Sequence, residues 1–140
     1  MANVLYPKYK QRLLDPNGAS GAAVDLNTDV IKFSLRTSST PYNSAHEFLS
    51  DLAGSAVGTD QTVATPTVTS GVFNADDPTW TSVASGSTVI SYVIYKSTGT
   101  ASTSNLIAFF DTDAAAAAIN IPTNGGNITL VLNASGIFAL

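Results

Sequence analysis

Short stretches of alternating apolar and polar residues run through this chain, and a period of two is typical of β-strands with one buried face. The first such stretch is 28–36, in which the polar positions 32, 34 and 36 are expected to face water. Another covers 128–132, near the C-terminal end. Two nearly continuous apolar runs, 89–95 and 106–110, predict strands that are buried on both faces.

One segment instead has the spacing of an amphipathic helix. Ser44 and Glu47 stand three residues apart, as in a capping box, and apolar residues follow at helical intervals. The pattern predicts one short α-helix over 44–52. Segment 62–69 is rich in β-branched residues but contains Pro66, which predicts an edge strand or a bulge. For 111–120, with its five successive alanines, a helical turn and a plain loop both fit.

Six or seven short strands separated by Gly, Pro and Asn turns predict the fold class. We expect a mainly β protein, an antiparallel β-sandwich with one short α-helix and an N-terminal arm. Residues 1–27 would form the arm, and residues 28–140 a single β-sandwich domain. The expected core consists of Ile31, Phe33, Phe48, Leu52, Val93, Leu106, Ile107, Ile128 and Leu130.

The arm combines a small basic cluster with apolar residues, and Pro7 is a favourable first residue for a short helix. Two helical turns are not stable alone, so the arm must pack against something. We expect it to dock on a partner, in which case deleting residues 1–14 would leave the body folded. The alternative is that the arm folds back on its own sandwich. The residues expected to contact the partner are Leu5, Tyr6, Lys8, Lys10, Arg12, Leu13 and Leu14.

Charge is scarce, since only 11% of the residues are charged where soluble domains carry about a quarter. Charged side chains normally keep protein surfaces apart, so their scarcity predicts a surface that lies against copies of the chain or a partner. The basic residues do not form the clustered surface that nucleic-acid binding requires. No apolar run approaches the roughly 18 residues of a membrane span. Neither nucleic acid nor membrane is therefore an expected partner.

The residues that carry most enzyme chemistry are almost missing from this sequence. It has no Cys, a single His at His46 and a single Glu at Glu47, so no second His or Cys exists to build a zinc site. The pairs Asp76–Asp77 and Asp111–Asp113 offer oxygen ligands to a hard cation, but aspartates in turns usually bond their own backbone. We predict a non-enzymatic protein without catalytic, cofactor or metal site.

Seven short motifs follow one another in a specific order along the chain: 5–8 (LYPK), 45–52 (AHEFLSDL), 72–77 (VFNADD), 93–99 (VIYKSTG), 104–111 (SNLIAFFD), 124–129 (NGGNIT) and 136–140 (GIFAL). Together they resemble a family of small structural proteins in the virions of tailed bacteriophages. The resemblance spans essentially the whole chain, although the family often has a hydrophobic residue at Pro78 and a basic one at Ala139.

This resemblance implies a capsid decoration, or cement, protein that stabilises the phage head by bridging major capsid subunits. The expected partners are the major capsid protein and copies of the chain itself, as a homotrimer. The protein would be made in the host cytoplasm and end on the capsid exterior of the virion. Two alternatives stay open: a tail or head–tail connector component, and a particle-displayed carbohydrate-binding module that uses Trp80 and the tyrosines.

Overall fold

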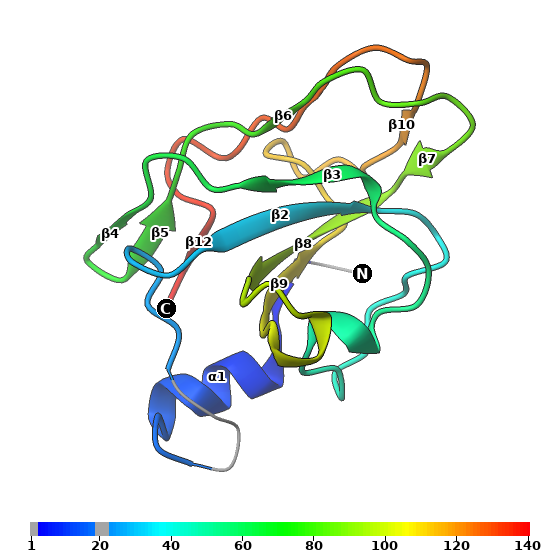
Figure 1. Ribbon diagram of the computed structural model, residues 1–140. Coiled ribbons are helices and arrows are strands. Elements are labelled where there is room, and N and C mark those ends of the chain that lie inside the picture. The colour runs from blue at the N-terminus through cyan, green and yellow to red at the C-terminus, as the bar shows by residue number, and fades with distance from the viewer. Residues whose placement is uncertain (1–2, 19–22) are drawn as a thin grey trace.

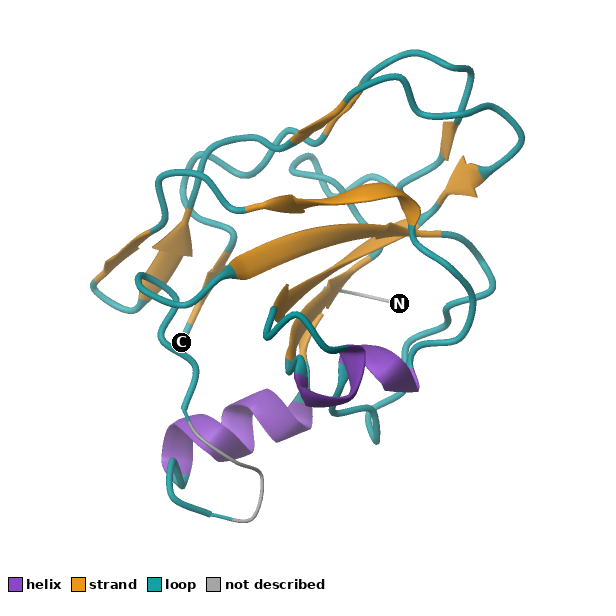
Figure 2. Cartoon of the chain, in the orientation of Figure 1, coloured by secondary structure: helices purple, strands orange, loops and turns teal. Residues whose placement is uncertain are grey.

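The computed structural model describes residues 3–18 and 23–140, and this part of the chain is mainly β, as predicted (Figures 1 and 2). It contains the α-helix α1 (Pro7–Leu14) and two 3₁₀ turns, η1 (Leu49–Asp51) and η2 (Ala101–Thr103). The strands are β1 (Val4–Leu5), β2 (Ile31–Arg36), β3 (Val57–Thr62), β4 (Thr67–Thr69), β5 (Val72–Asn74), β6 (Thr79–Trp80), β7 (Thr88–Val89), β8 (Ser91–Lys96), β9 (Leu106–Phe110), β10 (Ile121–Pro122), β11 (Ile128–Thr129) and β12 (Phe138–Ala139).

The main sheet has five antiparallel strands in the order β1-β9-β8-β2-β3. Its middle strands β8 and β9 are buried on both faces, which confirms the prediction from their continuous apolar runs. Three smaller antiparallel ladders form a second layer: β12-β5-β4, β11-β6 and β10-β7. In Figure 1 these ladders lie on one side of the main sheet, whereas α1 and the two 3₁₀ turns lie on the other.

The predicted helix over 44–52 is wrong in position, because only η1 is helical there and the α-helix is α1. Segment 47–49 bonds to the beginning of β9 instead. The Leu106 amide donates to the Glu47 carbonyl, and Phe48 forms a β-bridge with Asn105. The Asp51 carboxylate accepts hydrogen bonds from the Glu47 and Phe48 amides, both 2.8 Å long. The backbone groups of Glu47 and Phe48 would lie in the first turns of a helix over 44–52. Here they are already bonded to other partners, so the helix does not form.

Most of the polar face of β2 is covered, contrary to expectation, although Lys32 is partly exposed. Ser34 is fully buried and Arg36 is 5% exposed. The N-terminal arm accounts for part of this cover, because it packs on this side of the main sheet near Arg36. β1 extends the sheet by pairing with β9, and the Tyr6 ring lies close enough to Arg36 to interact electrostatically. In the described residues, the arm therefore folds back on its own sandwich, the second of the two alternatives.

The predicted core is otherwise confirmed, since each of its members except Phe48 is buried. Phe48 is half-buried beneath the Arg12 guanidinium, whose carbon lies 5.6 Å from the ring centroid. The loop alternative holds for 111–120, in which the Asp113 carboxylate accepts the Ala115 and Ala117 amides. Past Pro66 the chain forms β4, an exposed edge strand, as predicted.

Tyrosine side chains make the fold sensitive to alkaline pH. Burial raises the pKa of Tyr6, Tyr9, Tyr92 and Tyr95 above the ordinary value near 10, to about 12 for Tyr9. Unfolded tyrosines ionise at lower pH than these folded ones, so the unfolded state gains stability first. We expect the tyrosine contribution to folding stability to be constant below pH 10 and to fall as pH rises above it.

A titration that follows tyrosinate absorbance together with circular dichroism tests this expectation. Ionisation and loss of β-structure should occur together in one cooperative step above pH 10. Ionisation of all the tyrosines near pH 10, with the fold intact, would contradict the burial described above.

Candidate functional site

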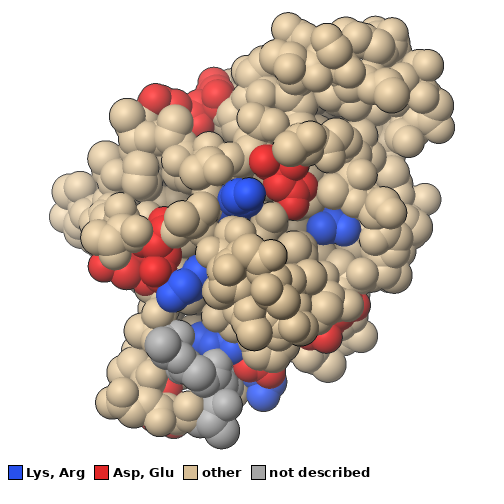
Figure 3. All heavy atoms as spheres, viewed as in Figure 1, with Lys and Arg blue, Asp and Glu red and all other residues tan. Residues whose placement is uncertain are grey.

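One end of the molecule carries no charged residue. We call it the uncharged lobe and define it as residues 78–90 and 119–132, which include β6, β7, β10 and β11. In Figure 3 the Lys, Arg, Asp and Glu side chains gather elsewhere on the visible face, and the upper right of the molecule is free of them. The exposed side chains of the lobe are mostly Ser, Thr and Asn, together with Val131, which is 66% exposed.

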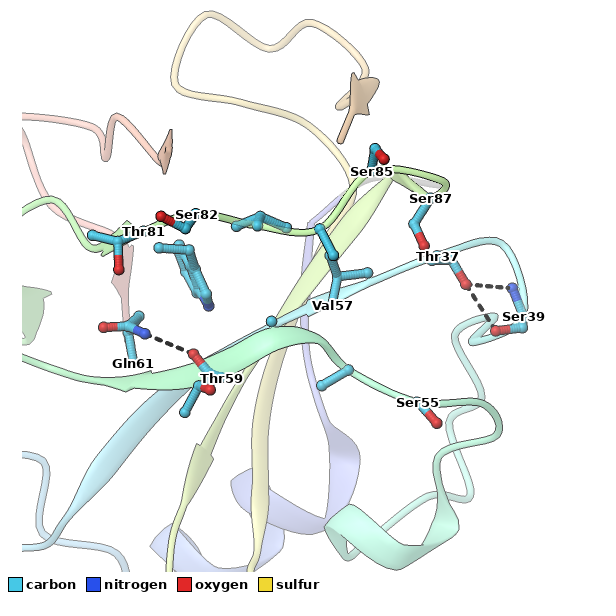
Figure 4. A pocket seen from close by; sticks show the side chains of 15 residues that line it. Thr37, Ser39, Ser55, Val57, Thr59, Gln61, Thr81, Ser82, Ser85 and Ser87 are labelled. Carbon is cyan, nitrogen blue, oxygen red and sulfur yellow. Dashed lines mark hydrogen bonds between the residues drawn. The ribbon is translucent and has the colours of Figure 1, made fainter. Parts of the chain in front are cut away.

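A groove of about 600 Å³ separates this lobe from the edge of the main sheet (Figure 4). One wall follows residues 55–61 and includes most of β3. The opposite wall follows residues 80–87, between β6 and β7. Thr37 and Ser39 lie at one end. The complete lining is Thr37, Ser39, Ser55, Ala56, Val57, Gly58, Thr59, Gln61, Trp80, Thr81, Ser82, Val83, Ala84, Ser85 and Ser87.

The groove offers neutral hydrogen-bonding groups and no charge. Most of its polar groups are Ser and Thr hydroxyls, which both donate and accept. Gln61 Nε2 donates to the Thr59 carbonyl at 2.6 Å, within the same wall. The two walls come close at Gly58, where a Cβ atom would lie 3.2 Å from Trp80 Cδ1. Gly58 also has a φ of +70°, so its conformation itself favours glycine.

Trp80 lines the groove without presenting a ring face to it. The residue is only 1% exposed and lies in the core between the layers. Its indole Nε1 is buried and has no hydrogen-bond partner among the described residues. A sugar ring usually binds against the open face of an aromatic side chain, and Trp80 cannot supply one in this conformation. Among the tyrosines, Tyr92 is also buried, at 6% exposed.

The structure divides the predicted arm contacts into two groups. Tyr6 and Arg12 are fully buried within the chain and cannot form an outer surface while the arm is in place. Leu5, Lys8 and Leu13 are half-buried. Lys10 is exposed, as is Leu14, at 88%. Only the half-buried and exposed residues are available to a partner, and their role in binding one stays a prediction.

Arg12 connects the arm to the segment before η1. Its Nη2 lies 2.5 Å from Glu47 Oε1 in an ion pair whose side chains are 0% and 22% exposed. Burial lowers the pKa of Arg12 from its usual value, and the Glu47 carboxylate acts in the opposite direction. An arginine remains charged under these influences, so the pair joins a fully buried positive charge to a partly exposed carboxylate. This arrangement fixes the arm and performs no chemistry by itself.

Two of the aspartates considered as cation ligands accept hydrogen bonds from backbone amides. Asp77 Oδ1 accepts the Leu132 amide at 2.8 Å, and Asp113 caps its own loop. No group of three or more His, Asp or Glu residues that could hold a metal ion occurs within 3–18 and 23–140. In the same residues, no helix is both long and apolar enough to cross a membrane.

Sequence reasoning missed the groove because its walls come from three separate stretches, 37–39, 55–61 and 80–87. The available signal in the sequence was the high density of Ser and Thr without charge in 81–88. This signal does not indicate that the segment lies opposite 55–61. Comparisons of the chain with protein-family models, curated proteins and solved structures found no match.

Proposed function

We propose that this protein is a non-enzymatic structural component of a tailed-phage particle, a capsid decoration protein that bridges major capsid subunits. The observation that carries the proposal is the uncharged lobe. A surface of neutral hydroxyl and amide groups costs less free energy to cover with protein than a charged surface, because hydrogen bonds to the partner can satisfy its groups and no charge has to be desolvated. The sequence resemblance to virion proteins supports the same assignment.

The proposed mechanism is mechanical. A protein seated across a junction between shell subunits resists their separation under the pressure of packaged DNA. Specific, stable protein contacts bury roughly 1,000 Å² or more in total, here spread over several contacts with the shell and with other copies. The homotrimer on the capsid exterior is part of the proposal, with the major capsid protein as its other partner.

Virions of the phage that encodes this chain, analysed by quantitative mass spectrometry, test the role. We expect hundreds of copies per particle and outer-shell density in a particle reconstruction. A dozen copies or fewer, with density at the portal or tail, would replace the decoration role with a connector or tail role. Absence of the protein from the virion would refute both.

A matched pair of substitutions tests the lobe itself. Val131→Glu places a charge on its surface, and Val68→Glu makes the same change on β4, where the side chain is 43% exposed. We expect Val131→Glu to weaken binding to heads that lack the protein by about tenfold or more, equivalent to about 1.4 kcal/mol. Val68→Glu should bind like the parent. Equal binding by both variants would show that the lobe is not the docking surface.

A further inference from the structure

We propose that the groove beside β3 binds an extended, uncharged segment of a partner polypeptide, which joins the main sheet as an additional strand. This binding does not require the virion role proposed above. The segment would lie along Ser55–Gln61, with residues 80–87 as the opposite wall (Figure 4).

The first support is the position of β3 at the edge of the main sheet. It is the terminal strand in the order β1-β9-β8-β2-β3, so its outer backbone side is not paired with another strand of that sheet. An unpaired edge of this kind is a template for an added strand, whose main-chain hydrogen bonds supply affinity. Within this wall the Thr59 carbonyl receives its bond from the Gln61 side chain, a bond that an incoming backbone amide can replace.

The second support is charge. None of the residues that line the groove is charged, and the wall formed by residues 80–87 belongs to the uncharged lobe. A Lys or Glu side chain that entered the groove would lose its water and find no opposite charge. Ser and Thr hydroxyls, by contrast, can pair with amides and carbonyls of either orientation. The groove therefore matches an uncharged segment.

The third support is Trp80. Its buried indole Nε1 can only donate, so the partner that it lacks is an acceptor, such as a peptide carbonyl. Trp80 Cδ1, the atom bonded to Nε1, lies against Gly58. The indole N–H therefore lies next to the wall along which the segment is proposed to bind, and in the proposed complex it donates to a carbonyl of that segment. An oligosaccharide fits less well, because Trp80 offers it no ring face.

A groove with two walls also favours a single free strand over the β3 strand of a second copy. That strand is already paired with β2, so it would bring a whole sheet against the wall at residues 80–87. The experiment must therefore distinguish self-association through this edge from the binding of a peptide.

The test selects ligands for the full chain from a displayed library of random peptides. Trp80 is the single tryptophan, so its fluorescence reports occupancy without a label. We expect selected peptides to be poor in charge and proline, to bind saturably and to change the Trp80 emission. N-methylation of alternate residues in a selected peptide should weaken binding by at least about tenfold, because strand addition requires backbone N–H groups.

Two arginine substitutions at exposed sites locate the binding. Thr59→Arg places bulk and charge in the groove, and Ser102→Arg makes a comparable change on η2, away from it. We expect about tenfold weaker peptide binding with Thr59→Arg and parental binding with Ser102→Arg. Failure to select any peptide, or selected peptides that bind Thr59→Arg as well as the parent, would overturn the proposal. So would a dimer or binding on a glycan array that Thr59→Arg abolishes, because the occupant would then be a second copy or a sugar.

Discussion

A chain that lacks residues 1–14 is expected to lose cooperative folding. Tyr6 and Tyr9 are almost completely buried in the common core, and β1 covers the outer edge of β9. Removal of one large buried aromatic side chain typically costs about 3–5 kcal/mol. The loss of two exhausts most of the roughly 5–15 kcal/mol by which a native domain is stable. This prediction differs from the expectation drawn from the sequence, in which the body stays folded without its arm.

Thermal unfolding followed by circular dichroism measures this effect. The single substitution Tyr6→Ala should lower the unfolding free energy by about 3–5 kcal/mol and remains measurable if the deleted chain does not fold. Lys10→Ala, at an exposed position of the same helix, is the control and should change stability by less than about 0.5 kcal/mol. A truncated chain that melts cooperatively at the parental temperature would show that the arm is not part of the fold.

Glu47→Ala is expected to destabilise the protein by about 3 kcal/mol, near the lower end for a broken buried ion pair. The reason is Arg12, which is fully buried and loses the carboxylate that lies 2.5 Å from it. The lower end applies because the Glu47 side chain is 22% exposed and water can partly replace it. Glu47→Gln keeps a hydrogen-bond acceptor but no charge, so this variant should lose less stability than Glu47→Ala. Chemical denaturation of the three chains gives the comparison.

The chain contains a matched control for this ion pair. Lys96 and Asp29 form a more exposed pair 2.9 Å apart, with side chains 21% and 24% exposed. Asp29→Asn should cost less than about 1 kcal/mol, because water screens both partners. If Asp29→Asn and the equivalent change Glu47→Gln have the same effect, burial of Arg12 does not determine the strength of its pair.

Periodicity was sufficient to predict the class of fold and the buried middle of the main sheet. The continuous apolar runs of β8 and β9 leave no face for water, so both had to be central strands. The alternating pattern in 28–36 also correctly predicted a strand, β2. Its polar face was assigned to water, because a pattern of side chains cannot tell whether another part of the chain covers that face.

The helix and the groove depended on contacts between distant residues. Segment 44–52 has a good local helix signal, but pairing with the beginning of β9 satisfies its backbone in another way. The groove exists only after β3 and the lobe come together, and its walls are separated in sequence by β4 and β5. Such tertiary pairings override local preference, and no window of sequence contains both partners.

The attachment of β1 to β9 has a consequence for how the protein acquires its structure. Asn3 accepts a hydrogen bond from the Asp111 amide, across a separation of 108 positions. During synthesis, β1 must therefore wait, unpaired, until β9 has been made. Contacts of such long range are slow to close and expose their partners in the meantime. We expect the last and slowest folding phase to be the closure of this edge, with fragments that stop before β9 unable to reach the native state.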